Sequence, residues 1–177
     1  MAGCLSRLLD APYVLCTGLE GATQLDWGKE PATFLVTTTA GVRLVDQGGG
    51  VTASPTAPPA RAPVRAGAVV AVGDLWADAE GVLWNDGAVV LSGLVHPRAM
   101  IRDRWNRAYV VAGEPEPALY RIDAGSLTLI AEWLGPVTDV AWGSGGWLLA
   151  DTLYLVRSDG VLEYLQPPGA PEGFVGR

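Results

Sequence analysis

Few residues of this chain have the side chains and the spacing that acid–base or nucleophilic chemistry requires. His96 is the single histidine, so it could act as a lone acid or base but could not join a metal site built from several histidines. Ser92 and Ser158 are candidate partners for a Ser/His/Asp arrangement, but neither lies in the G-x-S-x-G turn that exposes a reactive serine. The sequence therefore predicts no catalytic residue and no enzyme activity.

Motifs that bind phosphate, dinucleotides or calcium are also missing. The chain has no Walker A lysine motif, no G-x-G-x-x-G segment and no EF-hand loop. The glycine-rich segment 142–146 (WGSGG) surrounds a serine but lacks the nucleophile-elbow spacing, and it is typical of a turn between strands. We expect no cofactor.

The cysteines and the first residues bear on the compartment in which the protein is made. Cys4 and Cys16 are the only cysteines, which is too few for a disulfide scaffold or a four-cysteine zinc site, although one bridge could form. Neither a basic region nor an apolar stretch precedes Cys4, so no signal peptide is predicted. We expect synthesis in the cytoplasm, with reduced thiols.

The charge balance is acidic, with a formal net charge of −7. An acidic surface releases no counterions from a nucleic acid, so we expect no nucleic-acid partner. One local exception is a basic cluster within ten residues, made of Arg98, Arg102, Arg104 and Arg107. It could grip a phosphate, but a solvated strand edge or an ion-pair contact with a partner subunit agrees better with the overall acidity.

The composition is that of a β-rich globular domain. Of the 177 residues 49% are hydrophobic and 18% are charged, which is too apolar for disorder. No apolar run approaches the roughly 20 residues of a membrane span, so we expect a soluble protein without membrane contact. Glycines and prolines separate short runs of valine, leucine and threonine, which favours many tight turns and little helix.

A twelve-residue phrase recurs about every forty residues and ends at an aspartate. Residues 35–46 (LVTTTAGVRLVD) match residues 75–86 (LWADAEGVLWND) without a gap. A third copy, 110–123, has two extra residues in its turn, and a fourth covers 148–159. The closing aspartates are 40, 37 and 36 residues apart: Asp46, Asp86, Asp123 and Asp159. This period is typical of a small antiparallel sheet repeated around an axis.

Each repeat contains four short segments with the pattern of strands. The first strands are predicted at 23–27, 68–72, 101–105 and 138–142, and the second at 33–38, 74–77, 108–112 and 147–150. The third strand ends at the closing aspartate. The fourth opens after a turn in which glycine and aspartate tolerate a positive φ. Hairpins would therefore join four antiparallel strands into one unit.

This period and strand order resemble the β-propeller superfamily, the general architecture that includes WD40, NHL and kelch repeats. The resemblance covers residues 12–166 and implies an all-β fold in a single domain, 1–177, of about four blades with four antiparallel strands each. The blades would span 22–54, 64–94, 98–134 and 137–166, followed by a tail at 167–177. The marks of WD40 and kelch repeats are absent, so no specific family and no binding residue is implied. A twisted two-sheet sandwich is the alternative, and the forty-residue period disfavours it.

The two ends of the chain compete for one place in this architecture. Segments 12–19 and 160–166 both have the pattern of an outer strand, which makes five outer strands for four blades. We expect the N-terminal strand to close the ring by pairing beside the last blade. The alternative is that one end adds to the exposed sheet edge of a neighbouring molecule.

Acidic residues on the first strands raise the question of a metal site. In a propeller these strands line the central channel, where Asp26, Asp103 and Asp139 could hold a hard cation such as calcium. The three acids lie one, two and three residues before the tryptophan that ends their segment. Strand alternation then puts Asp103 on the opposite face from the others, so we predict no metal site.

The tryptophans fall into two groups. Trp27, Trp105 and Trp142 recur at one position of the repeat, which is typical of packing between blades. The remaining four do not recur, and an indole face can stack on a sugar ring. The residues that we predict for ligand stacking are therefore Trp76, Trp84, Trp133 and Trp147.

Two segments have the composition of mobile chain: the Pro-rich link 54–63 and the tail 167–177. Contact with neighbouring subunits is the simplest way to order these segments. We therefore predict a non-enzymatic structural or interaction subunit of a large assembly. Its partner subunits could include further copies of the same chain. A bacteriophage virion is the assembly that we favour, in its tail, fibre or baseplate. A carbohydrate-binding propeller lectin is the alternative. A hydrolase or lyase is disfavoured, because propeller enzymes need several convergent polar residues.

Overall fold

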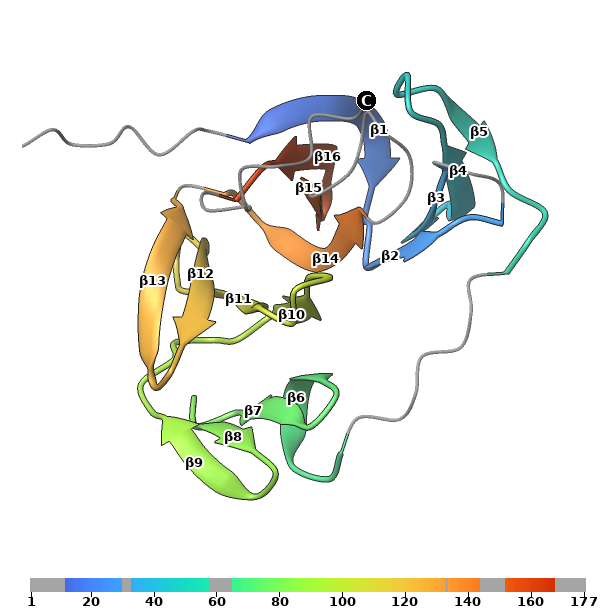
Figure 1. Ribbon diagram of the computed structural model, residues 1–177. Helices are drawn as coiled ribbons and strands as arrows, with labels where there is room; N and C mark the ends of the chain where they lie inside the picture. Colours follow the sequence, from blue (N-terminus) through green and yellow to red (C-terminus); the bar gives the residue numbers. More distant parts are fainter. Residues whose placement is uncertain (1–11, 30–32, 58–64, 133, 144–151, 168–177) are drawn as a thin grey trace, which may run out of the picture.

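The computed structural model describes residues 12–29, 33–57, 65–132, 134–143 and 152–167. These residues form four antiparallel sheets of four strands each (Figure 1). The strands are β1 Tyr13–Glu20, β2 Gln24–Trp27, β3 Phe34–Thr38, β4 Gly41–Val45, β5 Val51–Ala53, β6 Ala68–Val72, β7 Leu75–Asp78, β8 Leu83–Asn85, β9 Ala88–Leu91, β10 Ala99–Arg102, β11 Ala108–Ala112, β12 Ala118–Asp123, β13 Ser126–Ala131, β14 Val137–Gly143, β15 Thr152–Arg157 and β16 Asp159–Leu165. The all-β prediction is confirmed.

The four sheets are the blades of a propeller. Blade 1 contains β2 to β5, blade 2 contains β6 to β9, and blade 3 contains β10 to β13, in sequence order from the inner to the outer strand. Blade 4 contains β14, β15 and β16, with β1 outermost. The inner strands β2, β6, β10 and β14 surround a central space (Figure 1). This arrangement confirms the predicted propeller of four-stranded blades over the two-sheet sandwich.

None of the described residues form a helix with the length and hydropathy that a membrane-spanning helix needs.

The N-terminal strand completes the last blade. Strand β1 runs antiparallel to β16, with Tyr13 opposite Tyr164 and Leu19 opposite Gly160. The segment 160–166 is therefore the third strand of blade 4, not an outer strand. The count of five outer strands was wrong, and the expected closure by the N-terminal strand is confirmed.

The order of strands in blade 4 differs from the sequence prediction for a local reason. Strand β15 (Thr152–Arg157) is the second strand of this blade, whereas we predicted it at 147–150, which lie outside the described residues. In blades 1 and 3 the closing aspartates Asp46 and Asp123 lead from the third strand into the fourth. In blade 4 the turn at Asp159 joins the second and third strands instead, and Gly160 adopts a φ of 94° there. An aspartate at a tight turn therefore occurs in all three blades, but in blade 4 this turn connects a different pair of strands.

The first strand of blade 3 is shorter than predicted. Strand β10 ends at Arg102, so Asp103 and Trp105 lie in the turn to β11 and not on the strand. Asp103 Oδ1 accepts hydrogen bonds from the backbone N–H groups of Trp105 and Arg107 at 2.9 and 2.8 Å. An aspartate that binds backbone N–H groups two and four residues ahead competes with the strand ladder and ends it.

Hydrophobic cores fill three of the seams between blades. Inner strands lie side by side at each of these seams: β2 with β14, β14 with β10, and β10 with β6. The side chains that fill them include Phe34 and Tyr154 between blades 1 and 4, Tyr109 and Leu153 between blades 3 and 4, and Leu83 and Val110 between blades 2 and 3, all with an exposed fraction of 0%.

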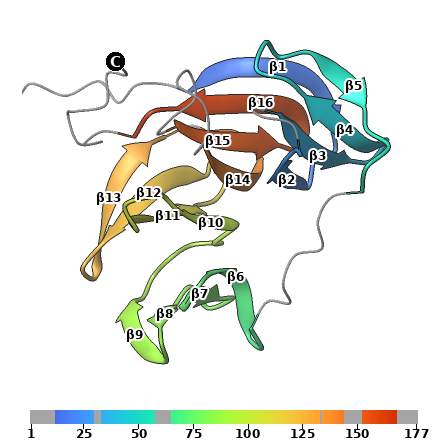
Figure 2. The same cartoon turned by 45° about the vertical axis from the view of Figure 1, so that its right-hand side comes forward.

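The seam between blades 1 and 2 is open. Both views show blade 2 standing apart from blade 1 on the side where the ring should close (Figures 1 and 2). Among the described residues, no hydrophobic core cluster combines side chains of these two blades. Blades 1 and 2 therefore follow one another in the sequence but share no hydrophobic core among the described residues.

Candidate interaction site

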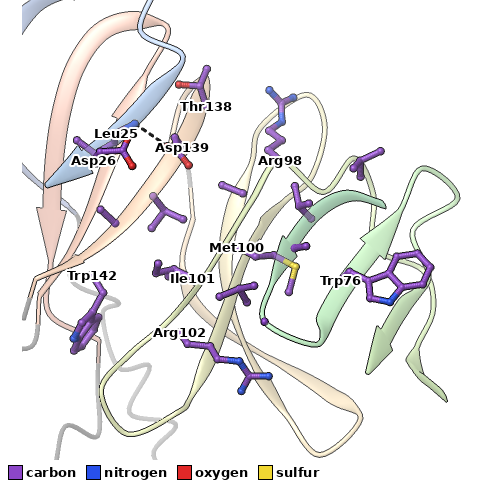
Figure 3. Close-up of a pocket in the computed structure, with 18 of the residues that line it drawn as sticks. Leu25, Asp26, Trp76, Arg98, Met100, Ile101, Arg102, Thr138, Asp139 and Trp142 are labelled. Atoms are coloured by element: carbon purple, nitrogen blue, oxygen red, sulfur yellow. Dashed lines mark hydrogen bonds between the residues drawn. The ribbon is translucent and has the colours of Figure 1, made fainter. Parts of the chain in front are cut away.

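Residues from all four blades line a cavity of about 1010 Å³ between the inner strands (Figure 3). Blades 1 and 4 contribute Leu25 and Asp139, blade 3 contributes Met100, and blade 2 contributes Val69 and Trp76. Figure 3 shows Trp76 on the far side of this cavity from Asp139 and Trp142. The cavity thus joins the central channel to one face of blade 2.

On the side of blades 1 and 4, hydrogen bonds between blades close the channel wall. The Leu25 N–H donates to Asp139 Oδ2 at 2.7 Å, and the Trp27 Nε1–H donates to the Trp142 carbonyl at 3.0 Å. Asp139 is buried, with an exposed fraction of only 4%. Its hydrogen bond to a backbone N–H of the adjacent blade gives this carboxylate a structural role at the seam.

The acids that we considered for a cation ring do not come together. Asp26 and Asp139 lie on β2 and β14 and line the channel, as expected from the sequence. Asp103 lies in the turn after β10, where its Oδ2 is 2.5 Å from Arg107 Nε and accepts from the Tyr109 hydroxyl at 3.3 Å. Its assignment to a first strand was wrong. No group of three or more His, Cys, Asp or Glu residues in the described part of the chain is placed to hold a metal ion.

The face of blade 2 that borders the open seam is apolar and partly exposed. Trp76 lies opposite Trp84 on neighbouring strands, and their rings stack with centroids 5.4 Å apart and planes 10° from parallel. Val69 and Val89 flank this pair with exposed fractions of 46% and 57%. We call this surface, defined by Val69, Trp76, Trp84 and Val89, the rear face of blade 2.

Strand alternation explains why these side chains share one face. Along β6 and β7 successive side chains point to opposite sides of the sheet. Val70 and Leu75 point into the core with blade 3, so Val69 and Trp76 point into the seam. The same sequence pattern that fills one seam therefore presents apolar side chains to the other.

Polar groups hold the tryptophan pair in place. Asp78 Oδ2 accepts from Trp84 Nε1–H at 2.9 Å, while its Oδ1 accepts from the Val82 backbone N–H at 2.8 Å. The Arg65 guanidinium lies over the Trp76 ring, 5.8 Å from its centroid. These contacts fix the ring orientations, which gives the rear face a defined shape.

The four clustered arginines do not form one patch. Arg98 and Arg102 line the channel but point toward its opposite ends (Figure 3). Arg102 Nη1 donates to the Asn106 carbonyl at 3.1 Å, which ties it to the turn after β10. Arg104 and Arg107 lie over the Trp105 ring, 4.4 and 4.8 Å from its centroid. Although the four arginines are close in sequence, two of them lie in the channel and the other two lie beside Trp105 in the turn after β10.

Neither the histidine nor the described cysteine is part of the channel. His96 lies on the surface between β9 and β10, and its Nε2 is 2.7 Å from Glu114 Oε2. Cys16 is a free, buried thiol on β1, and burial raises its pKa to about 11. A thiol with so high a pKa carries almost no thiolate at neutral pH and is a poor nucleophile.

The structure separates the predicted tryptophans by role. Trp27 packs against the core of blades 1 and 4, while Trp105 and Trp142 belong to the core of blades 3 and 4. Trp76 and Trp84 form the stacked pair on the rear face of blade 2. Trp133 and Trp147 lie outside the described residues. The exposed valines Val69 and Val89 were not predicted, although strand alternation beside the tryptophans could have indicated them.

The described residues form a β-propeller in which the seam between blades 1 and 2 is open. No protein-family model matches the sequence, and no curated protein matches it. Among solved structures, the chain is similar to one described as "Crystal structure of BBS1N in complex with ARL6DN, soaked with mercury". The two share 19% sequence identity over 78% of this chain and 47% of that chain, with a TM-score of 0.44. The chain thus spans about half the length of the solved chain that it matches.

Proposed function

We propose that the protein is a non-enzymatic structural or interaction subunit of a larger assembly, and that it binds a protein partner through the rear face of blade 2. The observation that carries this proposal is the exposure of Val69 and Val89 beside a stacked tryptophan pair. Contiguous apolar surface with a polar rim is typical of protein interaction sites, and aromatic side chains contribute much of the binding energy at such sites.

The polar groups of the channel support a non-enzymatic role. The described residues that line it include no histidine and no cysteine. Asp139, its most buried acid, accepts a backbone hydrogen bond that joins two blades. General acid–base catalysis needs a titratable group that can reach a substrate, and this carboxylate is committed to the fold.

The test is to size the native complex and identify its other chains by mass spectrometry after cross-linking. We expect the protein to migrate in a complex larger than its own dimer, with cross-links concentrated on blade 2. A bacteriophage tail, fibre or baseplate is the assembly that we propose, and co-purifying virion proteins would support it. A native protein that sediments without any other chain would contradict the proposal of a larger assembly.

Carbohydrate binding is a second candidate, favoured by the half-buried Trp76–Trp84 stack beside the channel. A sugar ring could stack on an indole face, and each aromatic contact of this kind supplies apolar area with defined geometry. A glycan array followed by calorimetric titration tests it. Trp84→Ala should abolish a measured affinity, whereas Tyr13→Ala, which alters an aromatic side chain that is 60% exposed elsewhere, should not. An array without any bound glycan removes this candidate.

A further inference from the structure

The three filled seams follow one rule of construction. In chain order, one face of each blade packs against the next blade, and we call it the forward face. The forward face of blade 2 includes Leu75 and Leu83, which pack with Val110 of blade 3. The forward face of blade 4 includes Tyr154, which packs with Phe34 of blade 1. At each filled seam a forward face thus covers the rear face of the following blade.

Among the described residues, the open seam leaves one face of each kind without its counterpart. The rear face of blade 2 has been described above. The forward face of blade 1 contains Leu35, which lies opposite Leu44, and Leu44 in turn lies opposite Thr52. Phe34 and Val45, which alternate with these residues, point into the core with blade 4. On this face Leu35 is buried, with an exposed fraction of 4%, whereas Leu44 is half-buried and Thr52 is exposed, so the uncovered part of the face lies on β4 and β5.

We infer that a second copy of this chain covers the open seam, with the forward face of blade 1 in one copy packed on the rear face of blade 2 in the other. This inference rests on the proposed function and names the first partner of that surface. Two copies related by a two-fold axis would make this contact twice and leave neither face uncovered.

The internal repeat supports this choice of partner. Residues 35–46 and 75–86 match without a gap, which places Leu35 of blade 1 where blade 2 has Leu75. Leu75 is on a forward face that already packs on the next blade of the same chain. On its second strand, blade 1 therefore carries the kind of residue that covers a rear face in this fold, and a second copy could supply it.

The net charge predicts how salt acts on this contact. Each copy carries a formal charge of −7, so two copies repel one another at long range. The contact surfaces are mainly apolar, and salt screens the repulsion without weakening apolar burial. Association should therefore become tighter as the salt concentration rises, whereas a contact built on ion pairs would become weaker.

Sedimentation equilibrium of the purified full chain tests the inference with a matched pair of variants. Val89→Glu places a charge on the rear face of blade 2, and Val14→Glu places one on the outermost strand of blade 4. The two valines are 57% and 59% exposed, so both variants should fold. We expect Val89→Glu to raise the dimer Kd at least about tenfold, because it buries an unpaired charge, and Val14→Glu to leave it within about twofold.

A mixing experiment tests which faces meet. Thr52→Glu alters the forward face of blade 1 and should weaken association of the variant with itself by a similar factor. In an equimolar mixture of Thr52→Glu and Val89→Glu, one of the two contacts per pair involves two unaltered faces. The mixture should therefore associate more tightly than either variant alone, which mass-tagged copies can show by native mass spectrometry.

Three results would overturn the inference: a wild-type protein that stays monomeric at about 100 μM, association that Val89→Glu does not weaken, or no effect of Thr52→Glu where Val89→Glu has one. The last result would indicate rear faces that pack on each other. A monomeric purified protein that still occurs with other chains in its native complex would leave the proposed function standing. A dimer found without other chains in the native source would support the inference and contradict the larger assembly.

Discussion

The seam between blades 4 and 1 and the seam between blades 1 and 2 differ in almost every interaction. The first holds Phe34 and Tyr154 at 0% exposure and is crossed by the hydrogen bond from Leu25 to Asp139. The second leaves Val89 with an exposed fraction of 57% beside a tryptophan pair. Blade 1 borders both seams. The structure of its sheet alone therefore cannot explain why one seam is filled by side chains and the other is open.

The chain connections differ at these two seams. Strand β1 belongs to blade 4 and leads through a turn of three residues, 21–23, into β2 of blade 1, so the backbone itself ties these blades together. Fourteen residues, 54–67, separate β5 from β6. A long connection restrains the two blades that it joins only weakly. Packing at the second seam must therefore be supplied by side-chain contact alone, and we infer that it comes from another molecule.

The largest difference should appear when aromatic side chains at the two seams are truncated. Phe34→Ala removes a ring that lies 4.6 Å from Trp27 and 4.5 Å from Tyr154, measured between centroids. We expect it to lower the free energy of unfolding by about 3–5 kcal/mol, as for other buried phenylalanines. Trp84→Ala should cost the monomer only about 1–2 kcal/mol, since part of that ring already contacts solvent. Urea titration measures both, and equal losses would contradict an open seam.

A second contrast uses two glycines that the repeat makes equivalent. A Cβ at Gly81 would lie 1.8 Å from the Leu94 carbonyl oxygen, and φ there is 77°. At Gly41, where φ is 104°, a Cβ would meet nothing within 4 Å. Gly81→Ala should therefore cost about 3 kcal/mol or more, because the backbone must shift, and Gly41→Ala about 1–2 kcal/mol for the positive φ alone. Thermal unfolding of the two variants measures the difference, and a larger loss for Gly41→Ala would contradict the structure.

A third, smaller effect tests the hydrogen bond across the closed seam. Asp139→Ala leaves the Leu25 N–H without this acceptor in a buried position. We expect a loss of about 1–3 kcal/mol in the free energy of unfolding. Asp139→Asn keeps an acceptor oxygen at the same place and should lose less. Hydrogen exchange at the Leu25 amide should be faster in the alanine variant, and unchanged exchange would count against this bond.

The acid response of the protein contrasts a carboxyl on the open face with one in the closed blade 4. Hydrogen bonds from the Trp84 indole and the Val82 backbone hold the pKa of Asp78 below its ordinary value. Burial raises the pKa of Glu163. The Arg157 guanidinium, whose Nη1 lies 2.7 Å from Glu163 Oε1, acts in the opposite direction and lowers it. A lowered pKa gives stability that is present above the ordinary value and is lost as pH falls through the folded value. A raised pKa gives stability that is present below the ordinary value and is lost as pH rises through the folded value.

The two carboxyl groups should therefore act in opposite directions on the pH profile. Asp78→Asn should reduce the loss of stability that accompanies acidification below about pH 4, the ordinary pKa of an aspartate. Glu163→Gln should remove a loss of stability that sets in as the pH rises above about 4.3, the ordinary pKa of a glutamate. Urea midpoints measured across the acid range give both slopes. Variants that both shift the profile in one direction would contradict the opposed pKa changes.

Much of the local architecture could be predicted from the sequence. The segments 68–72 and 108–112 have the predicted bounds, because alternating apolar residues and glycine turns are local signals. Blade 4 was misread because Asp159 resembles the closing aspartates of the other repeats but opens a different hairpin. Trp105 was misplaced because the Asp103 side chain ends strand β10 three residues early. In both cases the error came from an aspartate whose turn depends on its hydrogen-bond partners.

The candidate site was predicted only in part. Trp76 and Trp84 stand out in the sequence because they do not recur, but their stacking follows from the register of β7 and β8. Val69 and Val89 look like ordinary core valines. Their exposure is visible only once blade 2 is found without a neighbour on that side.

The sequence by itself determined the repeat, the alternation of apolar side chains and the positions of most turns, since these depend on residues a few positions apart. Only the tertiary structure decided which blade faces are covered. That outcome depends on contacts between residues more than a hundred positions apart, such as the Leu25 backbone N–H with the Asp139 carboxylate, and on connections of unequal length. Identical strand patterns can therefore become core at one seam and contact surface at another, because burial is a property of the neighbour as well as of the strand.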